Sequence, residues 1–179
     1  KATIVKHAIE MGVDPAIALS IARTESGFRH EARSSHGAVG VFQLMPSTAR
    51  RMGYNPYSLN ENIKAGITYY KKMYNMFGSV ELALAAYNAG PGNVKKYNNK
   101  VPPYGETRRF VSKIMSDVNR QRVAPDPIVA KVRSGAYTAQ KPAGTIKPAS
   151  APKLIDAKDL QVEVLEEKPI ELKLETLTI

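Results

Sequence analysis

The chain has 179 residues, 43% of them apolar, which suits one folded domain with a single core plus an extension. Its formal net charge of +10 favours an anionic partner, whether nucleic acid, an acidic membrane surface or a polyanionic cell wall. The chain contains no cysteine, which excludes disulfides and thiolate metal sites, and no apolar run approaches the roughly 20 residues that span a bilayer.

Two helices are predicted near the start of the chain. Residues 2–11 place apolar side chains on one face, as in a short amphipathic helix. Asp14 is a capping residue and Pro15 suits the first helical position, so a second helix is expected to run to Ser26. The serines and glycines of residues 29–41 show little periodicity and predict a surface loop.

Helical spacing continues downstream. A short helix is expected over residues 46–53, a longer one over 60–77 with Asn60 as its cap, and others over 79–88 and about 107–121. The side chains predicted to face the core are Ile63, Ile67, Tyr70, Tyr74, Phe77, Phe110, Ile114 and Val118. Almost no strand pattern appears before residue 150, so this part of the chain is predicted to be mainly α-helical.

The composition changes at Pro125 to proline, alanine, lysine and serine, which is typical of an extended linker. Beyond it, apolar and polar residues alternate over 160–164 and 170–174 and predict a short β-hairpin. Because a lone hairpin is marginal in water, this tail is expected either to dock on a larger assembly by strand addition or to fold back on its own domain. The predicted divisions are a helical domain over residues 1–122, a linker over 123–155 and an amphipathic β tail over 156–179.

Glu25 is the candidate for chemistry. It is followed by Ser26, Gly27 and Phe28, so a carboxyl group emerges at the end of an apolar helix beside a glycine that turns the chain. A partly buried carboxyl group has its charged form disfavoured, which raises its pKa and keeps a proton available near neutral pH. A general acid that breaks a glycosidic bond needs this property, although a lone glutamate at a helix end is more often a solvated surface residue.

Two further segments carry candidate binding side chains. Residues 37–49 join a glycine-bearing loop to Gln43, Met45 and a helix that begins with proline, and small residues there let a polymer approach the backbone closely. A second segment ends a helix with Tyr87, which is expected to pack on a sugar face, and Asn88, which is expected to hydrogen-bond an acetamido group. Taken singly, each of these residues has an ordinary structural explanation.

Taken together, the segments resemble the lytic transglycosylases of the soluble-lytic-transglycosylase type, in the lysozyme-like superfamily. Residues 25–28 match the family's Glu-Ser-x-Phe, residues 37–49 its Gly-Ala-x-Gly-x-x-Gln-x-Met-Pro-x-Thr-Ala, and residues 85–94 contain its Ala-Tyr-Asn-Ala-Gly. A fourth segment, residues 106–111, looks like the family's Glu-Thr-x-x-Tyr-Val, except that Phe110 stands where the family usually has Tyr. The similarity extends from about residue 5 to residue 118.

The resemblance implies a mainly α, lysozyme-like (goose-type-like) fold for residues 1–122 and a role for each matched residue. Glu25 is then the single catalytic acid and base, with Ser26 steadying it or the departing oxygen. The hydroxyl missing at Phe110 is expected to weaken hydrogen bonding to Glu25 unless Tyr87 supplies it. The residues expected to bind substrate are Ser26, Gln43, Met45, Tyr87, Asn88 and Glu106.

The substrate implied by the resemblance is the glycan strand of peptidoglycan, cut between N-acetylmuramic acid and N-acetylglucosamine with closure of a 1,6-anhydro ring. One carboxyl group suffices for this reaction, whereas an ordinary hydrolase needs a second carboxyl group beside the bond, for which Glu31, Glu61 and Glu106 are the candidates. A hydrolytic muramidase on the same scaffold is the closest alternative, and a glycan-binding module that cuts nothing is another.

No cofactor or metal is expected, because the three histidines are not paired with carboxylates on one helix face and no glycine-rich loop follows a strand. No nucleic acid partner is expected, since the basic residues are scattered rather than gathered with aromatics. The expected location is the periplasm or cell envelope, or alternatively a phage virion that delivers the protein to the periplasm. Residues 156–179 are the segment expected to dock on a larger envelope, secretion or phage tail assembly.

Overall fold

The computed structural model describes residues 1–135, which form eight α-helices and, apart from isolated bridges, no β-structure. The helices are α1 (Ala2–Glu10), α2 (Pro15–Ser26), α3 (Pro46–Arg51), α4 (Leu59–Phe77), α5 (Val80–Ala89), α6 (Pro91–Lys96), α7 (Gly105–Val123) and α8 (Pro127–Arg133). The mainly α-helical prediction is therefore confirmed. The predicted strands over 160–164 and 170–174, and the tail over 156–179, lie outside the described residues.

The borders of α2 follow from local chemistry. The Asp14 side chain accepts a hydrogen bond from the Ala16 backbone N–H at 2.9 Å, and Pro15 occupies the first helical position. Gly27 ends the helix in the left-handed conformation with φ of 61°, which a glycine adopts without steric cost. The predicted limits of this helix are confirmed, and they place Glu25 in its last turn.

The long helix α4 begins earlier than predicted. Its cap is Ser58, whose hydroxyl accepts from the Glu61 backbone N–H, so the assignment of the cap to Asn60 is wrong. Asn60 instead meets the His7 ring, with 2.7 Å between Oδ1 and Nε2. The predicted stripe is correct for most of its length, but Tyr74 is 43% exposed and does not belong to the core.

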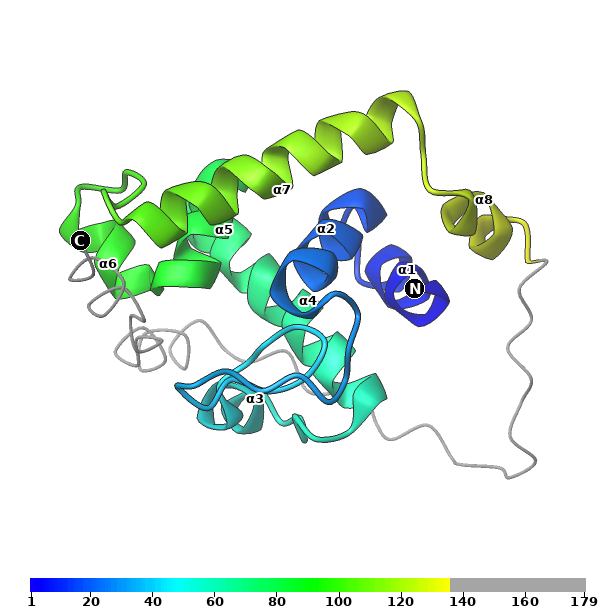
Figure 1. Ribbon diagram of the computed structural model, residues 1–179, viewed down its shortest axis with the longest axis horizontal. Helices are drawn as coiled ribbons and strands as arrows, with labels where there is room; N and C mark the ends of the chain where they lie inside the picture. The colour runs from blue at the N-terminus through cyan, green and yellow to red at the C-terminus, as the bar shows by residue number, and fades with distance from the viewer. Residues whose placement is uncertain (136–179) are drawn as a thin grey trace.

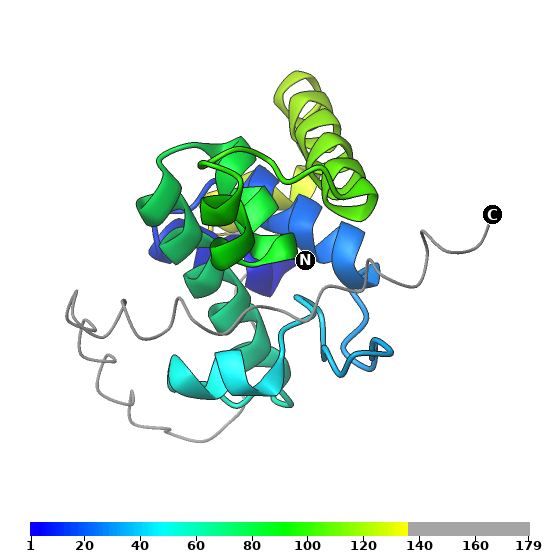
Figure 2. The same ribbon diagram turned by 90° about the vertical axis from the view of Figure 1, so that its left-hand side faces the viewer.

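The core lies where α4, α5, α2 and α7 meet. Helix α4 packs against α5 and α1, while α7 packs against both α2 and α5. Figures 1 and 2 show α7 along the outside of the bundle, with the loop between α2 and α3 on the opposite side of the molecule. The largest fully buried side chains are Tyr87, Phe42, Ile4, Leu19, Ile21, Leu44, Ile67, Leu84 and Ile114. Among the described helices, none combines the length and apolar content that a bilayer crossing requires.

Two short helices correct the prediction. Helix α6 begins at Pro91, just after the helix end predicted at residue 88 and where no helix was predicted. Helix α8 lies inside the predicted linker, where Asp126 caps it by accepting from the Ile128 backbone N–H at 3.0 Å. Apolar side chains of α8, including Val132, pack against the core next to α1. The prediction of an extended chain is therefore wrong for residues 127–133.

Candidate active site

Glu25 lies partly buried in the last turn of α2. Burial, followed by the negative charge of Glu25, raises the pKa of Tyr87 well above its ordinary value. Tyr87 comes from the last turn of α5, so the charge of a residue at the end of α2 influences a phenol at the end of α5.

Ser26 attaches the end of α2 to the following loop. Its side chain is buried, and its hydroxyl oxygen lies 2.7 Å from the Val41 carbonyl oxygen and 3.2 Å from that of Ala22, the two acceptors available to its single proton. The same oxygen accepts from the Arg29 backbone N–H at 3.2 Å. The Ser26 hydroxyl is therefore engaged by backbone groups, and its predicted contact with Glu25 or with substrate stays a prediction.

Residues 39–43, called the site loop below, are held by hydrogen bonds of side chains as well as of the backbone. Gln43 is buried, and its Nε2 donates to the carbonyl oxygens of Ala32 at 3.0 Å and Gly40 at 2.9 Å. Both amide hydrogens of Gln43 are thereby used inside the protein. Met45, which directly precedes α3, stays partly exposed, and its role as a substrate contact remains a prediction.

Tyr87 is fully buried and cannot offer a surface for a sugar, so the prediction that its ring packs on substrate is wrong. Its ring lies between those of Tyr69, at a centroid distance of 5.2 Å, and Phe110, which stacks on it at 6.2 Å. The Tyr87 hydroxyl donates its one proton to the Phe42 carbonyl oxygen at 2.6 Å. The single hydroxyl proton of Tyr87 is therefore used inside the protein.

A second cluster joins the end of α5 to the start of α7. The Asn88 Nδ2 donates to Glu106 Oε1 at 3.4 Å, and the buried Thr107 hydroxyl donates to Asn88 Oδ1 at 2.9 Å. Asn88 and Glu106 are both partly exposed. The structure therefore brings these two predicted site residues together, and their contact with substrate stays a prediction.

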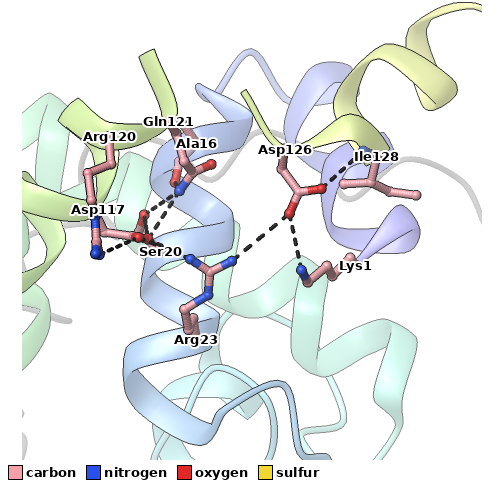
Figure 3. Close-up of polar contacts among 9 residues, drawn as sticks. All are labelled: Lys1, Ala16, Ser20, Arg23, Asp117, Arg120, Gln121, Asp126 and Ile128. Atoms are coloured by element: carbon pink, nitrogen blue, oxygen red, sulfur yellow. Dashed lines mark hydrogen bonds and ion pairs between the residues drawn. The ribbon is translucent and has the colours of Figure 1, made fainter. Parts of the chain in front are cut away.

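Two buried polar residues did not stand out in the sequence. Asn62 is fully buried on α4, and Asp117 is 5% exposed on α7. Figure 3 shows Asp117 accepting hydrogen bonds from Ser20 and Arg23 of α2, while Arg23 also approaches Asp126 at 4.0 Å. The sequence pattern that could have found Asn62 and Asp117 is a polar residue in a helix, with neighbours three and four positions away that face the core.

The remaining carboxyl groups considered for a hydrolase occupy different places. Glu31 is exposed in the loop after α2, and Glu61 accepts a hydrogen bond from the Asn55 backbone N–H at 3.2 Å. Over residues 1–135, no group of three or more histidine, aspartate or glutamate side chains is arranged to hold a metal ion.

The helical fold and the order of the motifs can be compared with known protein families. The sequence model of the transglycosylase SLT domain family matches residues 3–109, which is more than half of the chain. The chain belongs to this family, which confirms the resemblance found in the sequence.

Individual relatives agree with this assignment. The chain is 30% identical to the transglycosylase of Enterobacteria phage PRD1, over 65% of this chain and 42% of that protein. It is 31% identical to the soluble lytic murein transglycosylase of Escherichia coli, over 58% of this chain and 20% of that protein. The structure of an inactive glutamate-to-glutamine mutant of the lytic transglycosylase Slt from Pseudomonas aeruginosa is similar, with a TM-score of 0.62 and 32% identity over 72% of this chain and 25% of that one. The chain therefore spans less than half the length of these relatives.

Proposed function

We propose that the protein is a peptidoglycan lytic transglycosylase in which Glu25 acts as both acid and base. The observation that carries the proposal is the position of Glu25, a partly buried residue in the last turn of α2, inside the segment that matches the SLT family. Relatives named as murein transglycosylases support the same substrate.

In the first step, Glu25 donates its proton to the glycosidic oxygen as the bond between that oxygen and C1 of N-acetylmuramic acid breaks. The acetamido oxygen of the muramyl residue stabilises the cationic centre at C1. In the second step, the Glu25 carboxylate removes the proton of the C6 hydroxyl. The C6 oxygen bonds to C1 at the same time and closes the 1,6-anhydro ring. Glu25 ends protonated, as it began, and no water is consumed.

The surroundings of Glu25 suit this cycle. The Tyr87 hydroxyl donates its proton to the Phe42 carbonyl and so fixes the loop that also binds the residue after Glu25. An inverting or retaining hydrolase would need a second carboxyl group at a defined distance across the bond. Of the candidates, Glu61 and Glu106 already accept hydrogen bonds within the protein, which favours supporting roles for them.

The proposed location is the periplasm or cell envelope, with delivery by a phage particle as the alternative. A phage transglycosylase and a murein transglycosylase among the relatives support both parts of this proposal. Docking of residues 156–179 on a larger assembly stays a prediction, because that segment lies outside the described residues.

The substitution Glu25→Gln tests the catalytic role. It keeps the size of the side chain but removes the transferable proton, so we expect a normally folded protein with about a hundredfold to ten-thousandfold loss in rate. The measurement is release of soluble fragments from purified peptidoglycan. The matched control is Glu31→Gln, an exposed glutamate in the adjacent loop, which should keep full activity. Near-normal cleavage by the Glu25→Gln protein would refute the assignment.

A further inference from the structure

Asn62 is a fully buried amide near the start of α4, and its hydrogen-bonding groups are engaged by backbone atoms. Its Nδ2 donates to the carbonyl oxygens of Val39 at 2.9 Å and Pro56 at 3.0 Å. Its Oδ1 accepts from the Phe42 backbone N–H at 3.0 Å. Both amide hydrogens are therefore used, and a satisfied buried network of this kind fixes the backbone around it.

The site loop depends on such contacts, because Gln43 has an uncommon backbone conformation and Gly40 lies tightly against Asn62. Gln43 adopts a φ of 48°, which is uncommon for a residue other than glycine. Gly40 has a φ of 82°, and a Cβ atom there would lie 2.3 Å from the Asn62 Nδ2. One turn further along α4, a Cβ atom on Gly66 would lie 2.2 Å from the Phe42 ring. Helix α4 thus forms a close-fitting seat for the site loop.

Two carbonyl groups of the site loop accept hydrogen bonds, one from the residue that follows Glu25 and one from Tyr87. The Val41 oxygen accepts from the hydroxyl of the serine that follows Glu25, at 2.7 Å, and the Phe42 oxygen accepts from Tyr87 at 2.6 Å. The Phe42 residue is therefore held on both sides, through its N–H by Asn62 and through its carbonyl by Tyr87. A continuous chain of contacts leads from α4 to the surroundings of the acid.

We propose that Asn62 is a positioning residue for Glu25, acting by fixing the site loop that holds Tyr87 and the end of α2. This inference rests on the proposed function of Glu25. Because Asn62 is fully buried, it acts through the loop rather than on the glycan. Its loss should lower kcat and leave KM nearly unchanged. A displacement of about 1 Å at a catalytic group costs on the order of a hundredfold, so we expect a tenfold to hundredfold loss of kcat.

The test uses Asn62→Asp, which keeps the shape but replaces the donor nitrogen, and Asn62→Ser, which removes the second donor and leaves a hydroxyl. Both are made in the full chain and assayed on purified peptidoglycan at a temperature where thermal unfolding shows them to be folded. The control is Asp126→Ala, which removes the cap of α8, an ion pair with Lys1 at 3.1 Å and a contact with Arg23 at 4.0 Å, none of which involves the site loop. The control should lower the unfolding temperature and keep kcat.

A tenfold or greater fall in kcat with KM within twofold of wild type, in a folded Asn62 variant, supports the proposal. A folded Asn62 variant with kcat within twofold of wild type, or a change in KM alone, overturns it. If neither variant folds, Tyr87→Phe cuts the same chain of contacts at its last bond, and unchanged kcat in that protein also overturns the proposal. Glu25→Gln is assayed in parallel: if it stays active, the proposed function itself fails, whereas an inactive Glu25→Gln beside fully active Asn62 variants refutes only the positioning role.

Discussion

The substitution Asp117→Asn is expected to weaken the contact between α2 and α7. The carboxylate of Asp117 accepts hydrogen bonds from Ser20 at 2.6 Å, Arg23 at 3.0 Å, Arg120 at 2.9 Å and Gln121 at 3.1 Å (Figure 3). Asparagine replaces one accepting oxygen with a donating NH2 group, so some of these donors lose their partner. The protein should therefore unfold more readily.

The size of the stability loss follows from how exposed the hydrogen-bond donors to Asp117 are. A hydrogen bond to a charged group contributes about 1.5–3 kcal/mol. The side chains of Arg23 and Arg120 are 39% and 73% exposed, so water screens their share. Ser20 and Gln121 are buried and cannot turn to water instead. We expect a loss of about 2 kcal/mol, which lowers the unfolding temperature of a domain of this size by about 7 °C.

The stability loss caused by Asp117→Asn should depend on pH. Burial raises the pKa of Asp117, but the hydrogen bonds from Ser20 and Gln121 and the charges of Arg23 and Arg120 outweigh burial and hold that pKa below its ordinary value. A carboxyl group whose pKa is lowered by folding contributes stability that is fully present above its unfolded pKa and is lost as the pH falls through its folded pKa. The gap between wild type and Asp117→Asn should be full at pH 7 and shrink below about pH 4.

Thermal unfolding followed by circular dichroism at pH 7 and pH 3 measures both effects. Glu31→Gln, at an exposed position, is the matched control and should change neither curve. An Asp117→Asn protein as stable as wild type at pH 7 would contradict the reasoning, as would a gap of equal size at both pH values.

Two further stability predictions compare positions of known geometry. Gly40→Ala should lower the free energy of unfolding by more than about 2 kcal/mol, because the new Cβ would meet Asn62. Gly27→Ala should lower it by about 1 kcal/mol, because the positive φ is strained for alanine but the space around the residue is open. Ser79→Ala should cost about 1 kcal/mol, since the Ser79 hydroxyl accepts from the Leu82 N–H at the start of α5. Urea unfolding measures all three, and equal losses at the two glycines would show that the site loop tolerates the added methyl group.

The limits of several helices were predictable because neighbouring residues determine them. Asp14, Pro15 and Gly27 fix the ends of α2 by capping, by a preset φ and by a left-handed conformation. Helix α8 has the same kind of start signal in Asp126 and Pro127, but the proline-rich composition around these residues favours an extended chain. Local signals were more reliable there than average composition.

Side-chain burial depends on residues that are distant in the sequence, and the site was predicted less well for that reason. The motifs identified Glu25, but Tyr87 was predicted to touch sugar because the sequence does not show that Tyr69 and Phe110 enclose its ring. The role of Asn62 arises from three backbone groups in two loops that fold onto α4. Such contacts become visible only once the helices are placed in space.

The most direct test of the central claim is the mass of the fragments that the purified protein releases from peptidoglycan. If Glu25 drives both cleavage and ring closure, the new muramyl ends are 1,6-anhydro rings, lighter by one water than hydrolysed ends, and Glu25→Gln releases them at least about a hundredfold more slowly. Fragments carrying only water-added reducing ends would contradict the account and assign the protein to the hydrolases.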